Sequence, residues 1–179
     1  MLYAGLPARV VPVDLPTHHQ LLAAYDEPLG EGNTTFLSFS GATDSRRARG
    51  GGRAVTVSTH TDVARWERAA RDGTLPALRR RYERRLLAAL ERVVPGSPDR
   101  AEVLEAATPL TFERYTGRER GLVGGVPQTP RNATLGAIGH RTPVRGLYLC
   151  GDTTFPGQST VGATLSGFNA ARAALDPLS

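Results

Sequence analysis

The sequence predicts a mixed α/β fold in which strands precede two helices and a strand, a turn and a helix close the chain. Two β-branched segments, 34–40 and 53–59, flank a polar loop that contains three consecutive glycines. Residues 75–93 carry apolar side chains at helical spacing. Near the end, the apolar run 147–150 precedes Gly151-Asp152 and a segment rich in small residues. These patterns predict antiparallel pairing early and a strand-turn-helix unit late.

Length and composition fit one domain or a small pair. The chain has 179 residues, of which 40% are hydrophobic and 22% charged, which suffices for a core and its polar cover. The single cysteine, Cys150, excludes a disulfide scaffold, and no apolar run reaches the ~18 residues of a membrane span. Residues 1–20 contain Arg9, Asp14 and three prolines, a pattern unlike a signal or transit peptide. We therefore expect a cytoplasmic protein.

The chain has a positive net charge, and its basic residues are all of one type. The 22 basic residues exceed the 17 acidic residues by five, and every basic residue is arginine. The complete lack of lysine indicates a coding bias rather than selection for phosphate contacts. Aromatic residues are not interleaved with the arginines as they are in nucleic-acid recognition modules. We therefore expect no nucleic-acid binding, and an arginine-rich nucleic-acid binder stays a minor alternative.

The first two thirds of the chain predict a sheet with helices. We expect a strand at 2–4, an extended segment up to residue 20 that its prolines keep from being helical, and an antiparallel pair at 34–40 and 53–59. Helices are expected at 62–72 and 75–93. Asp62 is expected to cap the first of these helices rather than to orient His60 as a catalytic base.

The helix predicted at 75–93 has two different sides. One side is an apolar stripe, and most of its arginines lie elsewhere. That arginine side could contact a membrane surface or an acidic partner. A solvated helix face is the commoner explanation of such a pattern, and both interpretations stay open.

Two further segments precede the final motif. Residues 102–115 mix β-branched and apolar residues with Pro109, which predicts a long or broken strand. Residues 117–139 are rich in glycine and proline and predict a loop. We therefore place a boundary near Tyr115, which divides the chain into 1–115 and 116–179.

The end of the chain carries most of the chemical information. The run 147–150 predicts a strand buried on both faces, with Asp152 at its carboxyl end and a helix that begins near Ser159. A strand end, a carboxylate and a helix N-terminus that converge suit a nucleotide-like cofactor. A glycine-rich turn that serves packing alone is the alternative.

This end of the chain also resembles a known family. The segment GLYLCGDTTFPGQSTVGATLSGFNAAR resembles the carboxyl-terminal flavin-binding motif of the carotenoid (phytoene) desaturase group, amine-oxidase-like FAD oxidoreductases that include related isomerases. LYAGL, LPTHHQ and ATPLTFERYTGRERGLVGGVPQTP extend the resemblance upstream. It implies a partial FAD-binding flavoprotein fold. Residues 1–115 would be a partial substrate-binding region with part of an antiparallel sheet, and 116–179 the C-terminal part of the FAD-binding domain.

The resemblance also implies which residues bind FAD. Gly151 and Asp152 would lie beside the ribityl chain, with the Asp152 carboxylate accepting a hydrogen bond from a ribityl hydroxyl. Thr160, Val161 and Gly162 would begin a helix whose amides face the flavin pyrimidine carbonyl, where negative charge grows on reduction.

The reaction implied is hydride removal from an isoprenoid polyene in carotenoid biosynthesis, with peripheral membrane contact for substrate uptake. A carotenoid isomerase or saturase of the same flavin fold is the alternative, as is a truncated non-catalytic subunit. No residue is assigned as catalytic. The four histidines show no metal-binding spacing, so no metal is expected.

One part of the expected FAD site is missing from the sequence. No strand-GxGxxG-helix unit is found, and the nearest candidate, Gly30-Glu31-Gly32-Asn33, lacks the third glycine. We therefore expect an N-terminal dinucleotide-binding segment to be the missing partner. The chain alone is expected to be incomplete and inactive.

Overall fold

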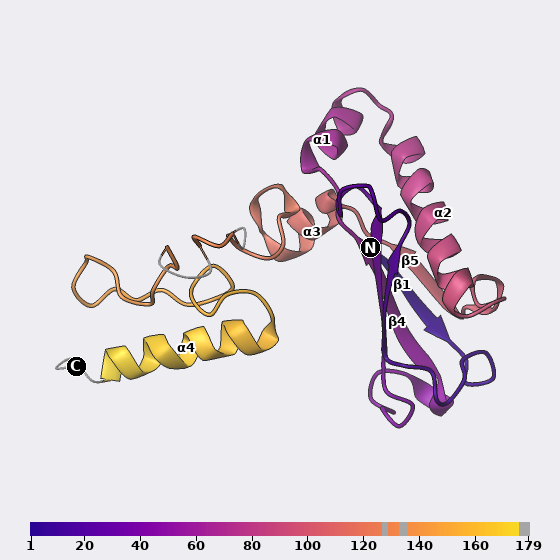
Figure 1. The fold of residues 1–179 in the computed structure, drawn as a ribbon, viewed down its shortest axis with the longest axis horizontal. Coiled ribbons are helices and arrows are strands. Elements are labelled where there is room, and N and C mark those ends of the chain that lie inside the picture. Colours follow the sequence, from indigo (N-terminus) through magenta and orange to yellow (C-terminus); the bar gives the residue numbers. More distant parts are fainter. Residues whose placement is uncertain (127–128, 133–135, 176–179) are drawn as a thin grey trace. The chain divides into compact units, whose positions relative to one another are not determined.

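The protein is a mixed α/β structure, as the sequence predicts (Figure 1). It is represented by a computed structural model that describes residues 1–126, 129–132 and 136–175. The chain divides into two compact units, Met1–Gly121 and Leu122–Ser179. The division falls at Gly121, whereas the sequence prediction placed a boundary near Tyr115.

The first unit contains an antiparallel sheet of five strands with the order β2-β3-β4-β1-β5. The strands are β1 (Leu2–Leu6), β2 (His18–Leu22), β3 (Thr34–Phe39), β4 (Arg53–Thr59) and β5 (Val103–Ala106). The predicted pairing of the two β-branched segments is confirmed, with Leu37 opposite Val57. Val57 also lies opposite Leu2, so β4 joins the outer hairpin to the N-terminal strand. The predicted strand at 2–4 is likewise confirmed, extended by two residues.

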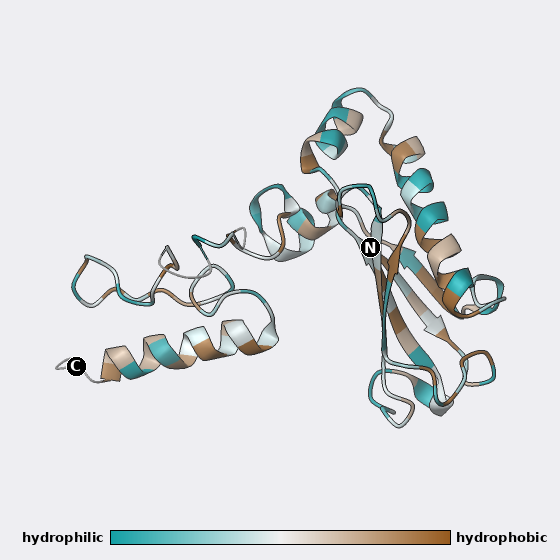
Figure 2. Cartoon of the chain, viewed as in Figure 1, coloured by the Kyte–Doolittle hydropathy of each residue, from teal (hydrophilic) through white to brown (hydrophobic). Residues whose placement is uncertain are grey.

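One face of this sheet forms the core. Residues alternate between the two faces of a strand, and β4 shows this in its alternation of buried and half-buried residues. Helix α2 (Leu75–Val93) packs on β1, β3 and β4 through its buried apolar stripe. The hydropathy colouring shows this stripe beside the polar turns of the same helix (Figure 2). The core cluster consists of Leu2, Ala4, Leu6, Val11, Leu37, Phe39, Val55, Val57, Leu86, Ala89, Leu90 and Val94.

Both predicted helices of the first unit are confirmed. Helix α1 (Val63–Arg71) begins where the Asp62 carboxylate accepts a hydrogen bond from the Ala64 amide at 2.9 Å. It ends before Gly73, whose φ of +70° is easy for glycine and costly for other residues. Helix α2 follows with a proline in its first turn, where the missing amide costs nothing.

The predicted long or broken strand at 102–115 is wrong in its second half. Only Val103–Ala106 is a strand, and helix α3 (Pro109–Thr116) follows it. Thr108 and Thr111 form a reciprocal capping box, and Pro109 occupies the first turn of the helix. The proline that suggests an interrupted strand therefore starts a helix.

Buried Arg53 fixes the proline-rich segment that follows β1. Its side chain donates hydrogen bonds to the carbonyl oxygens of Ser40 at 2.6 Å and Val13 at 3.0 Å. The residue is 3% exposed, and the hydrogen bonds that its side chain donates to the described residues all end on backbone carbonyls. The extended segment thus gains a fixed position without being a helix or a strand.

The second unit contains one helix among its described residues, α4 (Thr160–Leu175), where the sequence predicts it. The predicted loop 117–139 contains a 3-10 turn at Glu119–Gly121, and its residues 127–128 and 133–135 lie outside the described part. Among the helices described here, none is both long enough and apolar enough to span a membrane.

Candidate functional site

Helix α4 packs through its smallest residues. Its buried residues are Gly162, Ser166, Ala170 and Ala173, which recur every three or four positions and therefore share one face. Larger side chains of this helix are exposed instead: Val161 is 68% and Phe168 is 64% exposed. The small face allows a neighbouring backbone to approach closely.

That neighbouring backbone is the segment 151–157. The Gly151 amide donates a hydrogen bond to Ser166 Oγ at 2.6 Å, and the same hydroxyl donates to the Gly151 carbonyl at 3.1 Å. One turn nearer the helix start, a Cβ on Gly162 would lie 2.4 Å from the carbonyl oxygen of Gly157. The segment therefore follows the small face of α4 back to the helix N-terminus, and Gly162 must be glycine for this contact.

The first amides of α4 differ in their availability. Gly162 donates its amide hydrogen bond to Ser159 Oγ at 3.0 Å, so this amide is already used. For the amides of Thr160 and Val161, no acceptor exists among the described residues, and both residues are exposed. Of the three residues expected to face a flavin carbonyl, two can donate from the helix start as it stands.

Gly151 and Asp152 lie at the other end of this segment. Gly151 has a φ of +121°, and apart from its chain neighbours no atom of the described residues lies within 4 Å of the position that a Cβ would take. Asp152 is half-buried, and a Cβ on Gly125 would lie 2.5 Å from its carbonyl oxygen. Gly125 thus packs closely against the backbone of the Asp152 turn.

These features fit the ribityl and pyrimidine parts of a flavin. Ribityl hydroxyls need acceptors and a pyrimidine carbonyl needs donors. In such a site, the carboxylate of half-buried Asp152 would supply the acceptor and the two exposed amides would supply the donors, while the space beside Gly151 would permit close approach of a ligand.

The predicted buried strand at 147–150 is wrong. Tyr148 forms an isolated bridge with Arg141, and the flanking residues Leu147 and Leu149 are 51% and 43% exposed. Cys150 is exposed as well, against the expectation of a buried thiol. A run of apolar residues becomes a two-sided buried strand only where strands flank it. The described residues supply one bridge partner.

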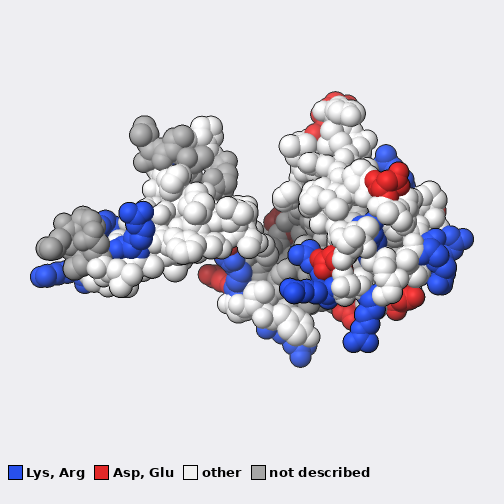
Figure 3. Space-filling model, turned by 90° about the horizontal axis from the view of Figure 1, so that it is seen from below, with Lys and Arg blue, Asp and Glu red and all other residues white. Residues whose placement is uncertain are grey.

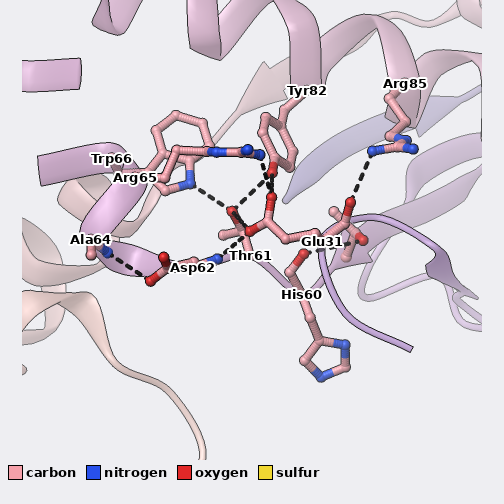
Figure 4. A network of polar contacts seen from close by, with 10 residues as sticks. Glu31, His60, Thr61, Asp62, Ala64, Arg65, Trp66, Tyr82 and Arg85 are labelled. Atoms are coloured by element: carbon pink, nitrogen blue, oxygen red, sulfur yellow. Dashed lines mark hydrogen bonds and ion pairs between the residues drawn. The ribbon is translucent and has the colours of Figure 1, made fainter. Parts of the chain in front are cut away.

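The first unit contains a polar network that the sequence analysis did not predict (Figure 4). The carboxylate of Glu31 accepts hydrogen bonds from the Tyr82 hydroxyl at 2.6 Å, the Thr61 hydroxyl at 3.1 Å, Arg65 and the Asp62 amide. Partial burial opposes the charge of this carboxylate, but these donors together hold the pKa of Glu31 below its ordinary value. The network ties the β2–β3 loop to α1 and α2.

His60 takes no part in this network, and its ring points away from Glu31 (Figure 4). Asp62 caps α1, which confirms the cap over the catalytic alternative. Within the described residues, no group of three or more histidine, cysteine, aspartate or glutamate side chains could hold a metal ion.

The chain is 29% identical over 177 residues to the chloroplastic prolycopene isomerase of Arabidopsis thaliana and 28% identical over 178 residues to that of Daucus carota. It is similar to prolycopene isomerases. Each match covers 93% of this chain and 28% or 27% of the relative, so the chain spans little more than a quarter of the length of these proteins.

Prolycopene isomerases 1 and 2 of an Oncidium hybrid cultivar match to the same extent, at 28% identity. No protein-family model matches the chain. The similarity supports the resemblance to the carotenoid desaturase group, which includes isomerases, and does not select one reaction within it.

Proposed function

We propose that this chain forms the C-terminal portion of an FAD-dependent enzyme of carotenoid metabolism. The observation that carries the proposal is the similarity to prolycopene isomerases over 93% of the chain, together with an Asp152 turn bound to the small face of α4. The relatives are carotenoid isomerases, so their names support isomerisation at least as well as the hydride removal implied by the desaturase motif.

In this proposal the second unit contacts the flavin. Asp152 accepts a ribityl hydrogen bond, and Gly151 leaves room for the chain of hydroxyls. The exposed amides of Thr160 and Val161 donate to the pyrimidine carbonyl, and Gly162 shapes the helix start by admitting the Gly157 carbonyl. When bound, FAD would supply the electron-accepting chemistry. The protein groups hold and orient it, and their fixed dipoles favour negative charge on the carbonyl.

The open face of the sheet supports a role of the first unit in substrate binding. Opposite the core, β1 and β3 present Tyr3 and Phe36, which are 38% and 40% exposed. Between them, β4 presents the small, half-buried residues Ala54, Thr56 and Ser58. Two exposed aromatic side chains with small residues between them leave space for an extended isoprenoid polyene to contact this face.

The test is product analysis with the protein translated from the whole gene, including any coding sequence upstream of Met1. The protein is incubated with FAD and prolycopene in detergent, with and without a reductant. The carotenoids are then separated, and their molecular masses are determined by mass spectrometry. Isomerisation gives a product of unchanged mass, because no atoms are lost. Desaturation of a less unsaturated precursor, assayed in parallel, gives a product lighter by two hydrogens.

Either product supports the proposal and identifies the reaction. If neither substrate changes while the protein retains FAD, the chain belongs to a flavoprotein with another substrate. If FAD is not retained either, the non-catalytic subunit becomes the better account.

A further inference from the structure

The sheet face opposite the core carries one row of polar side chains that crosses all five strands. His18 of β2 lies opposite Ser38 of β3, which lies opposite Thr56 of β4. Thr56 in turn lies opposite Tyr3 of β1, and Tyr3 lies opposite Glu105 of β5. Residues directly opposite one another point to the same side of a sheet. At about 4.8 Å between strands, this transverse row extends over about 19 Å.

The residues next to the row show which side of the sheet it faces. Val57 is fully buried in the core, so Thr56, the residue before it, points to the opposite side. The ring of His18 stacks on Phe36 with 5.6 Å between the ring centroids, and Phe36 is 40% exposed. The transverse row therefore lies on the open face of the sheet, beside an exposed aromatic ring.

The fold leaves most polar groups of the row unused. Within the part of the chain that the structure describes, no hydrogen bond or ion pair involves the side chains of Tyr3, Ser38, Thr56 and Glu105. Ser38 and Thr56, at the centre of the row, are already half-buried. A ligand on this face would therefore complete the burial of hydroxyls that have no partner in the protein.

Apolar groups flank the row on both sides. Phe36 lies on one side, two residues before Ser38 along β3. On the other side, Gly5 lies opposite both Ala54 and Val103, so these three residues form a second, apolar row. The open face thus offers apolar contact to a hydrocarbon chain and hydrogen bonds to one oxygen function within it.

A pure hydrocarbon fits the transverse row poorly. When it covers the face, it displaces water from three hydroxyls and offers them no hydrogen bond in exchange. An unpaired buried hydroxyl opposes binding more strongly than a paired one favours it. A ligand with an oxygen function at the row avoids this penalty.

The open face also lacks the cations that an anionic ligand needs. Arginine side chains project from several places on the first unit (Figure 3). Arg53 is the one arginine in the five described strands, and its buried guanidinium is bound to backbone carbonyls. The row itself contains the carboxylate of Glu105, which accepts hydrogen bonds and repels anions. A neutral alcohol, which both donates and accepts, therefore fits the row better than a diphosphate or a ketone.

We propose that the transverse row selects an isoprenoid polyene that carries an alcohol group. The hydroxyls of Tyr3, Ser38 and Thr56 donate to the alcohol oxygen, and a row oxygen, such as the Glu105 carboxylate, accepts from the alcohol hydroxyl. The inference rests on the proposed function, which assigns the open face to the substrate, and it names the substrate class more closely.

The test is competitive binding to the immobilised protein translated from the whole gene, loaded with FAD. Lycopene and 1-hydroxy-1,2-dihydrolycopene, which share one chain length, are supplied in equal amounts in detergent. The bound polyenes are extracted and quantified by chromatography. Flavin absorbance of the same samples gives FAD retention, and circular dichroism establishes that each variant is folded.

Two variants remove the same three hydroxyls from different places. The row variant is Tyr3→Phe, Ser38→Ala and Thr56→Val. The control variant is Tyr25→Phe, Ser45→Ala and Thr43→Val, at exposed positions outside the sheet.

We expect the unchanged protein to bind the alcohol about tenfold more tightly than lycopene, the effect of pairing one buried hydroxyl. The row variant should bind the two polyenes within about twofold of each other, because its face no longer has unpaired hydroxyls at the centre. The control variant should keep the preference of the unchanged protein.

Four results would overturn the inference. The first is binding of lycopene as tight as that of the alcohol by a protein that retains FAD, which leaves the proposed function standing. The second is an equal loss of preference in both variants. The third is tighter binding of geranylgeranyl diphosphate than of geranylgeraniol, which would assign the row to an anion. The fourth is binding of neither polyene, which would refute the proposed substrate as well.

Discussion

Ser166 holds Gly151 by both of its backbone groups: its hydroxyl accepts from the amide at 2.6 Å and donates to the carbonyl at 3.1 Å. Ser166 is fully buried, so no water replaces these bonds when the hydroxyl is removed. The turn that contains Asp152 thereby takes its position from the second turn of α4 rather than from a strand.

Removal of this hydroxyl should loosen the turn. In Ser166→Ala, a half-buried amide and carbonyl lose their partner, which costs about 1–3 kcal/mol. Hydrogen exchange of the Gly151 amide, followed by NMR, should accelerate by about five- to 150-fold. Thr164→Ala is the matched control, since the Thr164 hydroxyl bonds only within the exposed helix surface. Equal exchange rates for Gly151 in Ser166→Ala and the unchanged chain would refute this role.

Two glycines of α4 should respond in opposite directions to alanine. A Cβ at position 162 meets the Gly157 carbonyl at 2.4 Å, while a Cβ at position 167 meets no described atom within 4 Å outside the backbone of its own helix. Gly162→Ala should therefore destabilise the second unit, by about 1–3 kcal/mol. Gly167→Ala should stabilise the helix by up to about 1 kcal/mol, because alanine loses less backbone entropy. Exchange of the α4 amides measures both, and destabilisation by both substitutions would contradict the contact.

The Glu31 network should make the first unit sensitive to acid. The pKa of Glu31 in the folded protein lies below the 4.5 of an unperturbed glutamate, so the unfolded state binds the proton first. The stabilisation is then complete above about pH 4.5 and disappears as the pH falls through the lower folded value. Urea unfolding between pH 3 and 7 can be followed with Trp66, the only tryptophan in the chain.

Glu31→Gln should lower the free energy of unfolding at pH 7 by about 1–2 kcal/mol, a range reduced for the solvent exposure of the pair with Arg65. It should also remove most of the loss of stability between pH 5 and 3. Glu27→Gln, in the same loop and exposed, should change neither quantity. An unaltered pH profile in Glu31→Gln would show that other carboxylates control acid unfolding.

Replacement of Arg53 by lysine should lower the stability of the first unit. The planar guanidinium reaches the Ser40 and Val13 carbonyls from two nitrogens, and a lysine ammonium cannot reproduce that fork. Because the site is buried, Arg53→Lys should cost about 2–4 kcal/mol of unfolding free energy, read from Trp66 fluorescence in urea. Arg49→Lys, at an exposed position of the preceding loop, should cost less than about 0.5 kcal/mol. A similar effect of both substitutions would rule out the anchoring role of Arg53.

Local patterns predicted the elements whose neighbours are nearby in sequence. The pair of strands, the Asp62 cap and the three helices α1, α2 and α4 follow from alternation, helical spacing and capping residues. Pro109 misled the interpretation because a proline suits both a strand break and the first turn of a helix. The Thr108-Thr111 capping box was the signal that decides between them.

Local sequence patterns could not predict the contacts between residues far apart in the chain. Glu31 accepts from Thr61, 30 residues away, and Arg53 donates to Val13, 40 residues away. Nothing in the sequence around Glu31 or Arg53 indicates these partners. The run 147–150 was predicted to be a buried strand because such strands commonly consist of apolar residues. Its burial, however, depends on whether other strands flank it. The small-residue face of α4 did carry a signal, since Gly162, Ser166 and Ala170 recur at a spacing of four.

The most direct test of the central claim is flavin retention by the protein translated from the whole gene, measured by visible absorbance after gel filtration. The account predicts that the unchanged protein retains FAD. Asp152→Ala should weaken retention by about five- to 150-fold, the effect of a lost charge-assisted hydrogen bond of about 1–3 kcal/mol. Asp99→Ala, an exposed aspartate in the first unit, should have no effect. A protein that never retains FAD, or retains it equally well in Asp152→Ala, would contradict the account.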